Sequence, residues 1–231
     1  MANEISPENT DRGIRTYVLR AGRMTEGQKH ALEEIGPRFI IPYSPGSYLD
    51  MEAIYSNDRP IVAEIGFGMG QATWQIALAN PQTNYLGIEV HTPGVGKLLA
   101  EIVEHDLRNI RIIHQDAIEF LEHAVKPLSF AGFHIFYPDP WPKKRHQKRR
   151  LLRPGLIELL VSRLAPGGYL YFVTDIEEYA SSSLNLLSTT SGLRNRYDGF
   201  APRQSWRPET KFEHRASIVG REAWELFFER F

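Results

Sequence analysis

The chain has 231 residues, of which 42% are apolar and 24% are charged. A chain of this length and composition builds a domain with a substantial core, so disordered and fibrous proteins are excluded. The 27 basic residues nearly balance the 28 acidic ones, and any site for a polyanion therefore has to be a local patch. Cysteine is absent, which excludes disulfides and thiolate chemistry. With no secretory signal and no run of about 20 apolar residues, we expect a cytoplasmic protein without a membrane partner.

Residues 1–38 carry six Lys and Arg residues among glycines and polar residues, and they show no sustained apolar period. This stretch is predicted to be a flexible, basic N-terminal arm. The remainder, residues 39–231, is predicted to be a single domain, because it contains no internal repeat or low-complexity segment.

From Pro60 onward, short apolar runs alternate with segments of helix length. This alternation predicts an α/β protein in which crossover helices connect the strands of a parallel sheet. Asn80-Pro81 is expected to end a helix that begins near Gly70, and residues 165–168 to end another helix and lead into a strand. The predicted strands are residues 61–65, 85–88, 110–113, 133–137 and 169–173, with a late, largely buried strand of undetermined direction near residues 224–228.

A glycine-rich loop follows the first apolar run directly. Its glycines, Gly66, Gly68 and Gly70, allow the backbone to turn tightly and to approach a ligand. The spacing departs from the Gly-x-Gly-x-x-Gly fingerprint that receives a pyrophosphate, so a nucleoside without phosphates is the expected ligand. The same departure disfavours a nicotinamide-dependent oxidoreductase.

Acidic residues stand at the ends of the first three apolar runs: Glu64, Glu89 and Asp116. The carboxyl ends of parallel strands share one edge of the sheet, and an acid after the second strand can accept hydrogen bonds from ribose hydroxyls. Each acid alone could equally be a helix N-cap. Together with the glycine loop they predict a nucleoside-cofactor site, and they resemble the S-adenosylmethionine-binding half of class I methyltransferases.

The segment Pro138-Asp139-Pro140-Trp141 follows the fourth run. Its prolines are expected to push the residues before them into extended conformations, which would place the Asp139 carboxylate on a stiff support, as a catalytic group requires. Trp141 could stack on an unstacked base, or it could pack beside the proline-rich turn.

Seven of the 27 basic residues fall within the eleven positions from Lys143 to Arg153, with no acid among them. Such a cluster in a chain of net charge −1 indicates a patch that contacts phosphates, although a charge run can also be only a solvated face.

Residues 136–146 are similar to the signature of bacterial tRNA (guanine-N7)-methyltransferases, and the segments 64–70, 87–91, 115–117, 172–175 and 209–213 resemble further motifs of that family in the same order. The resemblance covers roughly residues 37–231. It implies a Rossmann-like class I methyltransferase fold: a mostly parallel sheet of about seven strands with helices on both faces. It also implies a tRNA (guanine(46)-N7)-methyltransferase, which transfers a methyl group from S-adenosylmethionine to the variable-loop guanosine of tRNA.

The resemblance and the glycine loop assign roles to individual residues. Asp139 is the expected catalytic residue. Cofactor binding falls to Glu64, Gly66, Gly68, Gly70, Glu89, Asp116, Ala117 and Asp139, contact with the target nucleotide to Lys143, Asp175, Thr210, Lys211, Phe212 and Glu213, and RNA binding to Arg145, His146, Gln147, Lys148, Arg149 and Arg150.

Guanine N7 carries a lone pair and no proton, so the reaction requires no general base, and Asp139 is expected to orient the base and stabilise developing charge. The histidine spacing offers no metal motif, so no metal is expected. A monomer or a homodimer without an obligate protein partner is expected. Two alternatives remain open: a class I methyltransferase that acts on another RNA, a protein or a small molecule, and an RNA-binding protein that has lost catalysis.

Overall fold

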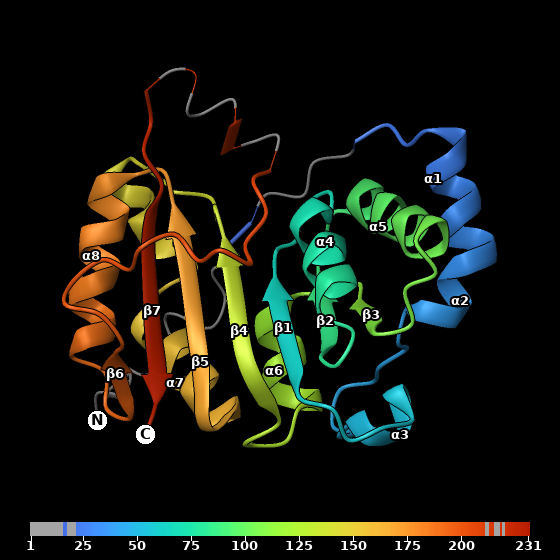
Figure 1. Cartoon of the computed structure of the whole chain (residues 1–231), viewed down its shortest axis with the longest axis horizontal. Helices are drawn as coiled ribbons and strands as arrows, with labels where there is room; N and C mark the ends of the chain where they lie inside the picture. The colour runs from blue at the N-terminus through green and yellow to red at the C-terminus, as the bar shows by residue number, and fades with distance from the viewer. Residues whose placement is uncertain (1–15, 18–21, 211–212, 215–217, 219) are drawn as a thin grey trace, which may run out of the picture.

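A seven-stranded sheet with the order β3-β2-β1-β4-β5-β7-β6 forms the centre of the protein (Figure 1). The computed structural model describes residues 16–17, 22–210, 213–214, 218 and 220–231. The five parallel strands are β1 (Ile61–Ile65), β2 (Asn84–Ile88), β3 (Ile110–Ile113), β4 (Phe130–Phe136) and β5 (Leu164–Thr174), and β7 (Trp224–Arg230) lies antiparallel between β5 and β6 (Leu193–Asn195). The expected mostly parallel sheet is confirmed.

Helices cover both faces of this sheet (Figure 1). One face packs against α4 (Gln71–Ala79) and α5 (Thr92–Glu104), and the other against α6 (Ala117–Ala124), α7 (Pro154–Arg163) and α8 (Glu177–Ser188). The short helix α3 (Met51–Tyr55) precedes β1. Among the helices of the described residues, none combines the length and the apolarity needed to cross a membrane.

Three strands depart from the prediction. β4 begins at Phe130, three residues before its predicted start. β5 starts at Leu164, because the turn residues Pro166 and Gly167 lie within the strand at a shift of register against β4 rather than in front of it. β6 has only three residues, which is too short for an apolar alternation to reveal it.

Part of the predicted arm is helical and packs on the domain. Residues 26–39 form α1 (Glu26–His30), a π-helical turn (Ala31–Ile35) and α2 (Gly36–Phe39), and a capping box at Thr25 starts this segment. Its apolar side chains pack with α5 in one core cluster. A π turn shifts the apolar period by one residue, which explains why the sequence pattern conceals this helix. The flexibility predicted for the remainder of the arm stays a prediction.

Residues 196–210 cover the half of the α4/α5 face that carries no helix, across β4, β5 and β7 (Figure 1). Ala201 forms a β-bridge with Glu225 of β7, and the Trp206 ring stacks on His134 of β4 with 5.1 Å between the centroids. This covering segment, which the sequence pattern did not indicate, approaches the carboxyl edge of the sheet, where the functional residues lie.

Candidate active site

A cavity of about 460 Å³ opens at the carboxyl edge of the parallel strands. Small-molecule sites commonly fall between about 300 and 1,000 Å³, so the space suits a nucleoside cofactor. Its walls are the glycine loop, the ends of β2 and β3, the segment 137–139, and Thr16 and Tyr17 from the N-terminal segment.

The glycine loop forms one wall with main-chain atoms. Gly66 and Gly68 line the cavity with φ values of 75° and 57°, and a Cβ atom on either would meet nothing within 4 Å. Gly70, also at positive φ, lies outside the lining and starts α4. Gly94 of α5 stands behind the loop, because a Cβ atom there would lie 1.9 Å from the carbonyl oxygen of Gly68.

Glu89 braces this loop and faces the cavity. Its Oε2 accepts a hydrogen bond from the Gly68 N–H at 2.8 Å, and its Oε1 accepts the N–H groups of Val90 and His91 at 2.7 and 2.9 Å. A carboxylate offers about four lone-pair positions, so one remains at Oε2 for a ligand hydroxyl.

Asp116 has both of the roles considered from the sequence. Its Oδ1 accepts hydrogen bonds from the N–H groups of Ile118 and Glu119 at 2.9 and 3.0 Å and thereby caps α6. Asp116, Ala117 and Ile118 also line the cavity. The remaining carboxylate oxygen and the two apolar side chains thus contribute a further part of the cavity wall.

Glu64, predicted to bind the cofactor, does not line the cavity. Its side chain is 4% exposed, and burial, followed by the nearby Glu89 carboxylate, raises its pKa to about 7. A charge is costly in such surroundings, so burial favours the neutral form of Glu64.

The Asp139 segment is rigid, although not as the prolines predicted. Asp139 is exposed on the cavity wall beside Pro138. Tyr137 and Trp141, each directly before a proline, have φ values of 50° and 43° instead of extended values. A hydrogen bond from the Tyr137 N–H to the Val173 carbonyl at 2.8 Å helps to hold this strained turn, as is typical of functional sites.

Trp141 packs against the protein and holds the N-terminal segment at the cavity. Its Nε1–H donates to the Thr16 carbonyl at 3.1 Å, and the Arg149 guanidinium lies 3.9 Å from its ring centroid. Arg149 also donates to the Tyr17 carbonyl at 3.1 Å. Both carbonyls belong to residues that line the cavity, so this pair of side chains fixes part of its cover.

The predicted RNA-binding run divides into two parts. Residues 144–149 form a 3₁₀ helix on which Arg145 and Lys148 are exposed, as is Lys143 directly before it, while His146 and Gln147 are half-buried. Arg150 departs from the expected RNA contact. It is 6% exposed, donates to the Pro140 carbonyl at 2.9 Å and pairs with Glu178 of α8, so it has a structural role.

A second cavity, of about 290 Å³, adjoins the first through the shared residue Tyr137. Asp175 and Glu213, both expected at the target nucleotide, line it. Thr210 directly follows Glu209, which lines this cavity, and its hydroxyl accepts a hydrogen bond from the Glu213 N–H at 3.2 Å. Lys211 and Phe212 lie outside the described residues. Asp175 pairs with Arg221 at 3.0 Å.

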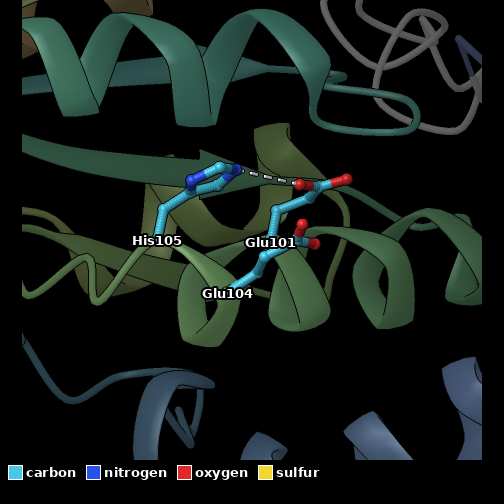
Figure 2. A group of neighbouring side chains, drawn as sticks. All are labelled: Glu101, Glu104 and His105. Atoms are coloured by element: carbon cyan, nitrogen blue, oxygen red, sulfur yellow. Dashed lines mark ion pairs between the residues drawn. The ribbon is translucent and has the colours of Figure 1, made fainter.

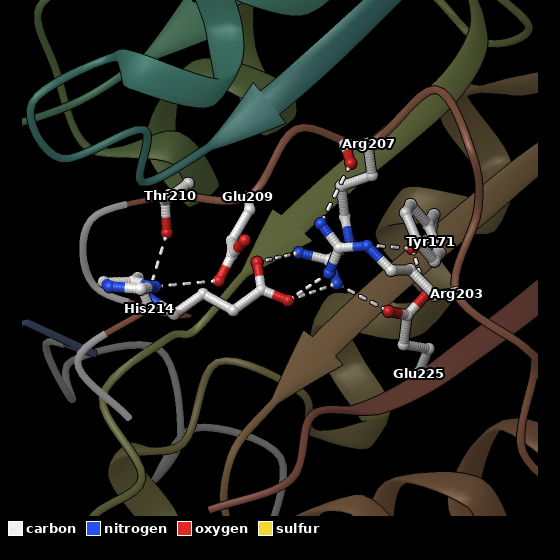
Figure 3. Close-up of polar contacts among 8 residues, drawn as sticks. Tyr171, Arg203, Arg207, Glu209, Thr210, His214 and Glu225 are labelled. Atoms are coloured by element: carbon white, nitrogen blue, oxygen red, sulfur yellow. Dashed lines mark hydrogen bonds and ion pairs between the residues drawn. The ribbon is translucent and has the colours of Figure 1, made fainter. Parts of the chain in front are cut away.

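The sequence pattern did not indicate Arg207, a buried arginine that contacts the lining residue Glu213 of this cavity. Arg207 binds Glu213, Glu225 and the Tyr171 hydroxyl at once (Figure 3). An acid at position 225, at the start of an otherwise apolar run, was the one signal that a buried partner exists.

The comparisons with known proteins agree with this geometry. A family model described as "Putative methyltransferase" matches residues 58–226. The chain is 51% identical over 219 residues to the tRNA (guanine-N(7)-)-methyltransferase of Acidovorax sp. (strain JS42). The aligned region covers 95% of this chain and 87% of that protein. The chain is 50% identical over 217 residues to the protein of the same name from Thiobacillus denitrificans (strain ATCC 25259 / T1), with 94% and 95% covered. The chain belongs to the tRNA (guanine-N7)-methyltransferase family.

The fold is also shared with distant structures. The 16S rRNA methyltransferase KamB has a TM-score of 0.57 at 11% identity, over 83% of this chain and 98% of that one. The expected Rossmann-like class I methyltransferase fold is thereby confirmed.

One group of acids and histidine in the described part of the enzyme has the composition of a metal site: Glu101, Glu104 and His105 at the end of α5 (Figure 2). Glu101 and His105 already have partners within the protein. Glu101 pairs with Lys97 at 2.6 Å and with His105 at 3.4 Å, and the His105 ring stacks on Trp74. None of the three lines either cavity described above, so the group has no part in this site.

Glu64→Gln should stabilise the protein increasingly as the pH rises. The folded-state pKa of about 7 lies above the ordinary value of 4.5, so between these pH values the unfolded chain ionises at Glu64 more readily than the folded protein does. The wild type therefore loses stability as the pH rises from 4.5 to 7, and the loss is complete above pH 7. Relative to the wild type, the variant should gain about 1–3 kcal/mol in unfolding free energy between pH 4.5 and 8, measured by urea denaturation without ligand. An equal difference at both pH values would contradict a raised pKa.

Trp141→Phe should weaken cofactor binding, because it keeps an aromatic ring but loses the donor to the Thr16 carbonyl. The dissociation constant of S-adenosylhomocysteine, measured by calorimetry, should rise about two- to tenfold, as expected for one lost hydrogen bond. Trp74→Phe serves as the control, because Trp74 stacks on His105 outside the cavity. Equal affinities for both variants and the wild type would show that the hydrogen bond from Trp141 to the N-terminal segment does not contribute to cofactor binding.

Proposed function

We propose that this enzyme transfers the methyl group of S-adenosylmethionine to N7 of guanosine 46 in the variable loop of tRNA. The observation that carries the proposal is the junction of two cavities at the Asp139 segment, where Tyr137 lines both. One cavity has the size and wall chemistry for the cofactor. The other presents acids that can recognise a base. Membership of the family supports tRNA as the substrate.

The cofactor fits the first cavity by the chemistry of its walls. Glu89 keeps one acceptor position for a ribose hydroxyl, and Gly66 and Gly68 leave open space where side chains would intrude. Ala117 and Ile118 offer an apolar surface to the adenine ring. When bound, S-adenosylmethionine supplies an electrophilic methyl group on a sulfonium ion.

The residues of the chain contribute position and charge to the reaction. Guanine N7 needs no deprotonation, so the enzyme has to hold N7 in line with the methyl group and exclude water. Positive charge moves onto the purine during transfer, and the Asp139 carboxylate at the wall can stabilise it. Exposed Arg145 and Lys148 on the same segment suit the phosphates of the tRNA backbone, Lys143 directly before them stays the expected contact with the target nucleotide, and a cytoplasmic location suits that substrate.

The first experiment is methyl transfer to unmodified tRNA transcripts followed by nucleoside analysis. Asp139→Asn should lower the single-turnover rate about ten- to a hundredfold, since a carboxylate near developing charge contributes on that scale. Folding should be unchanged because Asp139 is exposed. Asp58→Asn, an exposed acid before β1, is the matched control and should react normally. A normal rate for Asp139→Asn, or no 7-methylguanosine with any transcript, would refute the proposal for the residue or for the reaction.

Replacement of both Arg145 and Lys148 by Ala should weaken tRNA binding and flatten its salt dependence. Two lost phosphate contacts reduce the slope of log K against log salt by about 1 to 2. Filter binding over a range of KCl concentrations measures this slope. The double replacement of Arg108 and Lys126, which are exposed and lie outside the basic run, should leave it unchanged. Equal slopes for both double variants would assign residues 144–149 to a solvated face.

A further inference from the structure

We propose that Arg207 is the positioning residue of the acceptor pocket, and that it holds the Glu213 carboxylate where the exocyclic amine and N1–H of the target guanine can donate to it. This inference rests on the proposed function, because it takes the second cavity as the place of the guanine. It adds Arg207, with Tyr171 and Glu225 behind it, to the residues that the reaction depends on.

Arg207 holds Glu213 in one orientation. Its Nη1 donates to Glu213 Oε2 at 2.7 Å and its Nη2 to Oε1 at 2.9 Å, a two-pronged contact that stops the carboxylate from rotating (Figure 3). The Arg207 side chain is only 1% exposed. Glu213 lines the second cavity, so the group that Arg207 fixes is one that a ligand can reach.

The sheet holds Arg207 from the other side. Its Nη2 also donates to Glu225 Oε1 at 2.6 Å, and its Nε donates to the Tyr171 hydroxyl at 3.0 Å. The Tyr171 hydroxyl in turn donates to Glu225. Tyr171 belongs to β5 and Glu225 to β7, two paired strands, so the anchor has the rigidity of the sheet.

Glu213 remains an ionised acceptor in this arrangement. Burial alone would raise its pKa, but Arg207, together with Arg203, outweighs burial and lowers the pKa below its usual range. Arg207 uses one lone-pair position on each oxygen, and Arg203 uses a second on Oε1. The Tyr137 hydroxyl also interacts with Glu213, so a guanine would take the place of this hydroxyl and, for a second hydrogen bond, that of Arg203, which is 42% exposed.

This geometry matches the chemistry of guanine. The N1–H and the exocyclic amine lie on the edge of the purine opposite N7, and an ionised carboxylate is an acceptor for both. A guanine whose amine edge meets Glu213 directs N7 away from it. Tyr137 lines both cavities, so N7 of a guanine in the second cavity can lie close to a cofactor in the first. Adenine has no N–H donor at N1 and no amine at C2, and the pocket would reject it.

The test combines Arg207→Lys with a tRNA transcript that carries inosine, which lacks the exocyclic amine, in place of the acceptor guanosine. For the wild type, the single-turnover rate at saturating cofactor should fall about tenfold with inosine, as for a lost hydrogen bond to a charged acceptor. Arg207→Lys keeps the charge but not the two-pronged contact. It should react about tenfold more slowly with guanosine, lose less than about threefold further with inosine, and bind S-adenosylhomocysteine as the wild type does.

Two further variants guard against a general effect on folding. Tyr171→Phe removes one support of Arg207 and should reduce the inosine effect in the same direction. Arg163→Lys is the matched control, since Arg163 donates to the Leu121 carbonyl at the opposite edge of the sheet and should keep the full inosine effect.

Each outcome has one meaning. An inosine effect of equal size in the wild type and in Arg207→Lys, or no inosine effect in the wild type, overturns the role of Arg207 while methylation of guanosine still supports the proposed function. A wild type that methylates neither transcript overturns both.

Discussion

The shape of the first cavity, where we propose that the cofactor binds, depends on the carboxylate of Glu89. This carboxylate accepts the N–H of Gly68 from the loop after β1 and the N–H groups of Val90 and His91 at the end of its own strand, β2. Two neighbouring strand ends are thereby joined through one anion. All three donors are main-chain groups, so the shape of the wall follows from backbone geometry. Hydrogen bonds to a charged acceptor are about twice as strong as neutral ones, which suits a loop of glycines with little stiffness of its own.

Two buried arginines likewise join separate segments of the chain, near Asp139 and near the second cavity. Arg150 joins the turn that carries Asp139 to α8, through Pro140 and Glu178, and Arg207 joins the second cavity to β5 and β7. Each is neutralised by carboxylates, as a buried charge must be. The cations of the 3₁₀ helix that remain exposed, among them Arg145 and Lys148, are those proposed to contact the tRNA backbone. Basic side chains of the same segment thus differ in burial, and only the exposed ones are available to a polyanion.

The features that were predicted correctly from the sequence are those that depend on short apolar runs and on residue spacing. The strands β1 and β3, the glycine loop, and the acids at the strand ends all follow from apolar runs and spacing, and the structure places Glu89, Asp116 and Asp139 around one cavity. The sequence could not reveal the π turn at residues 31–35, which breaks the helical period, nor the covering segment 196–210, which has no period. Arg150 shows a further limit: within a run of cations, only the packing of the folded chain decides which one is buried.

The insertion of β7 between β5 and β6 sets an order of assembly. The lining residues of the first cavity all come at or before Leu151 in the chain. The anchor of Arg207 also needs Glu225, which belongs to the last strand in chain order. During synthesis from the N-terminus, the residues of the first cavity emerge well before Glu225, which completes the anchor of Arg207 beside the second cavity. Until β7 has paired with its two neighbours, Arg207 lacks one of its two carboxylate partners.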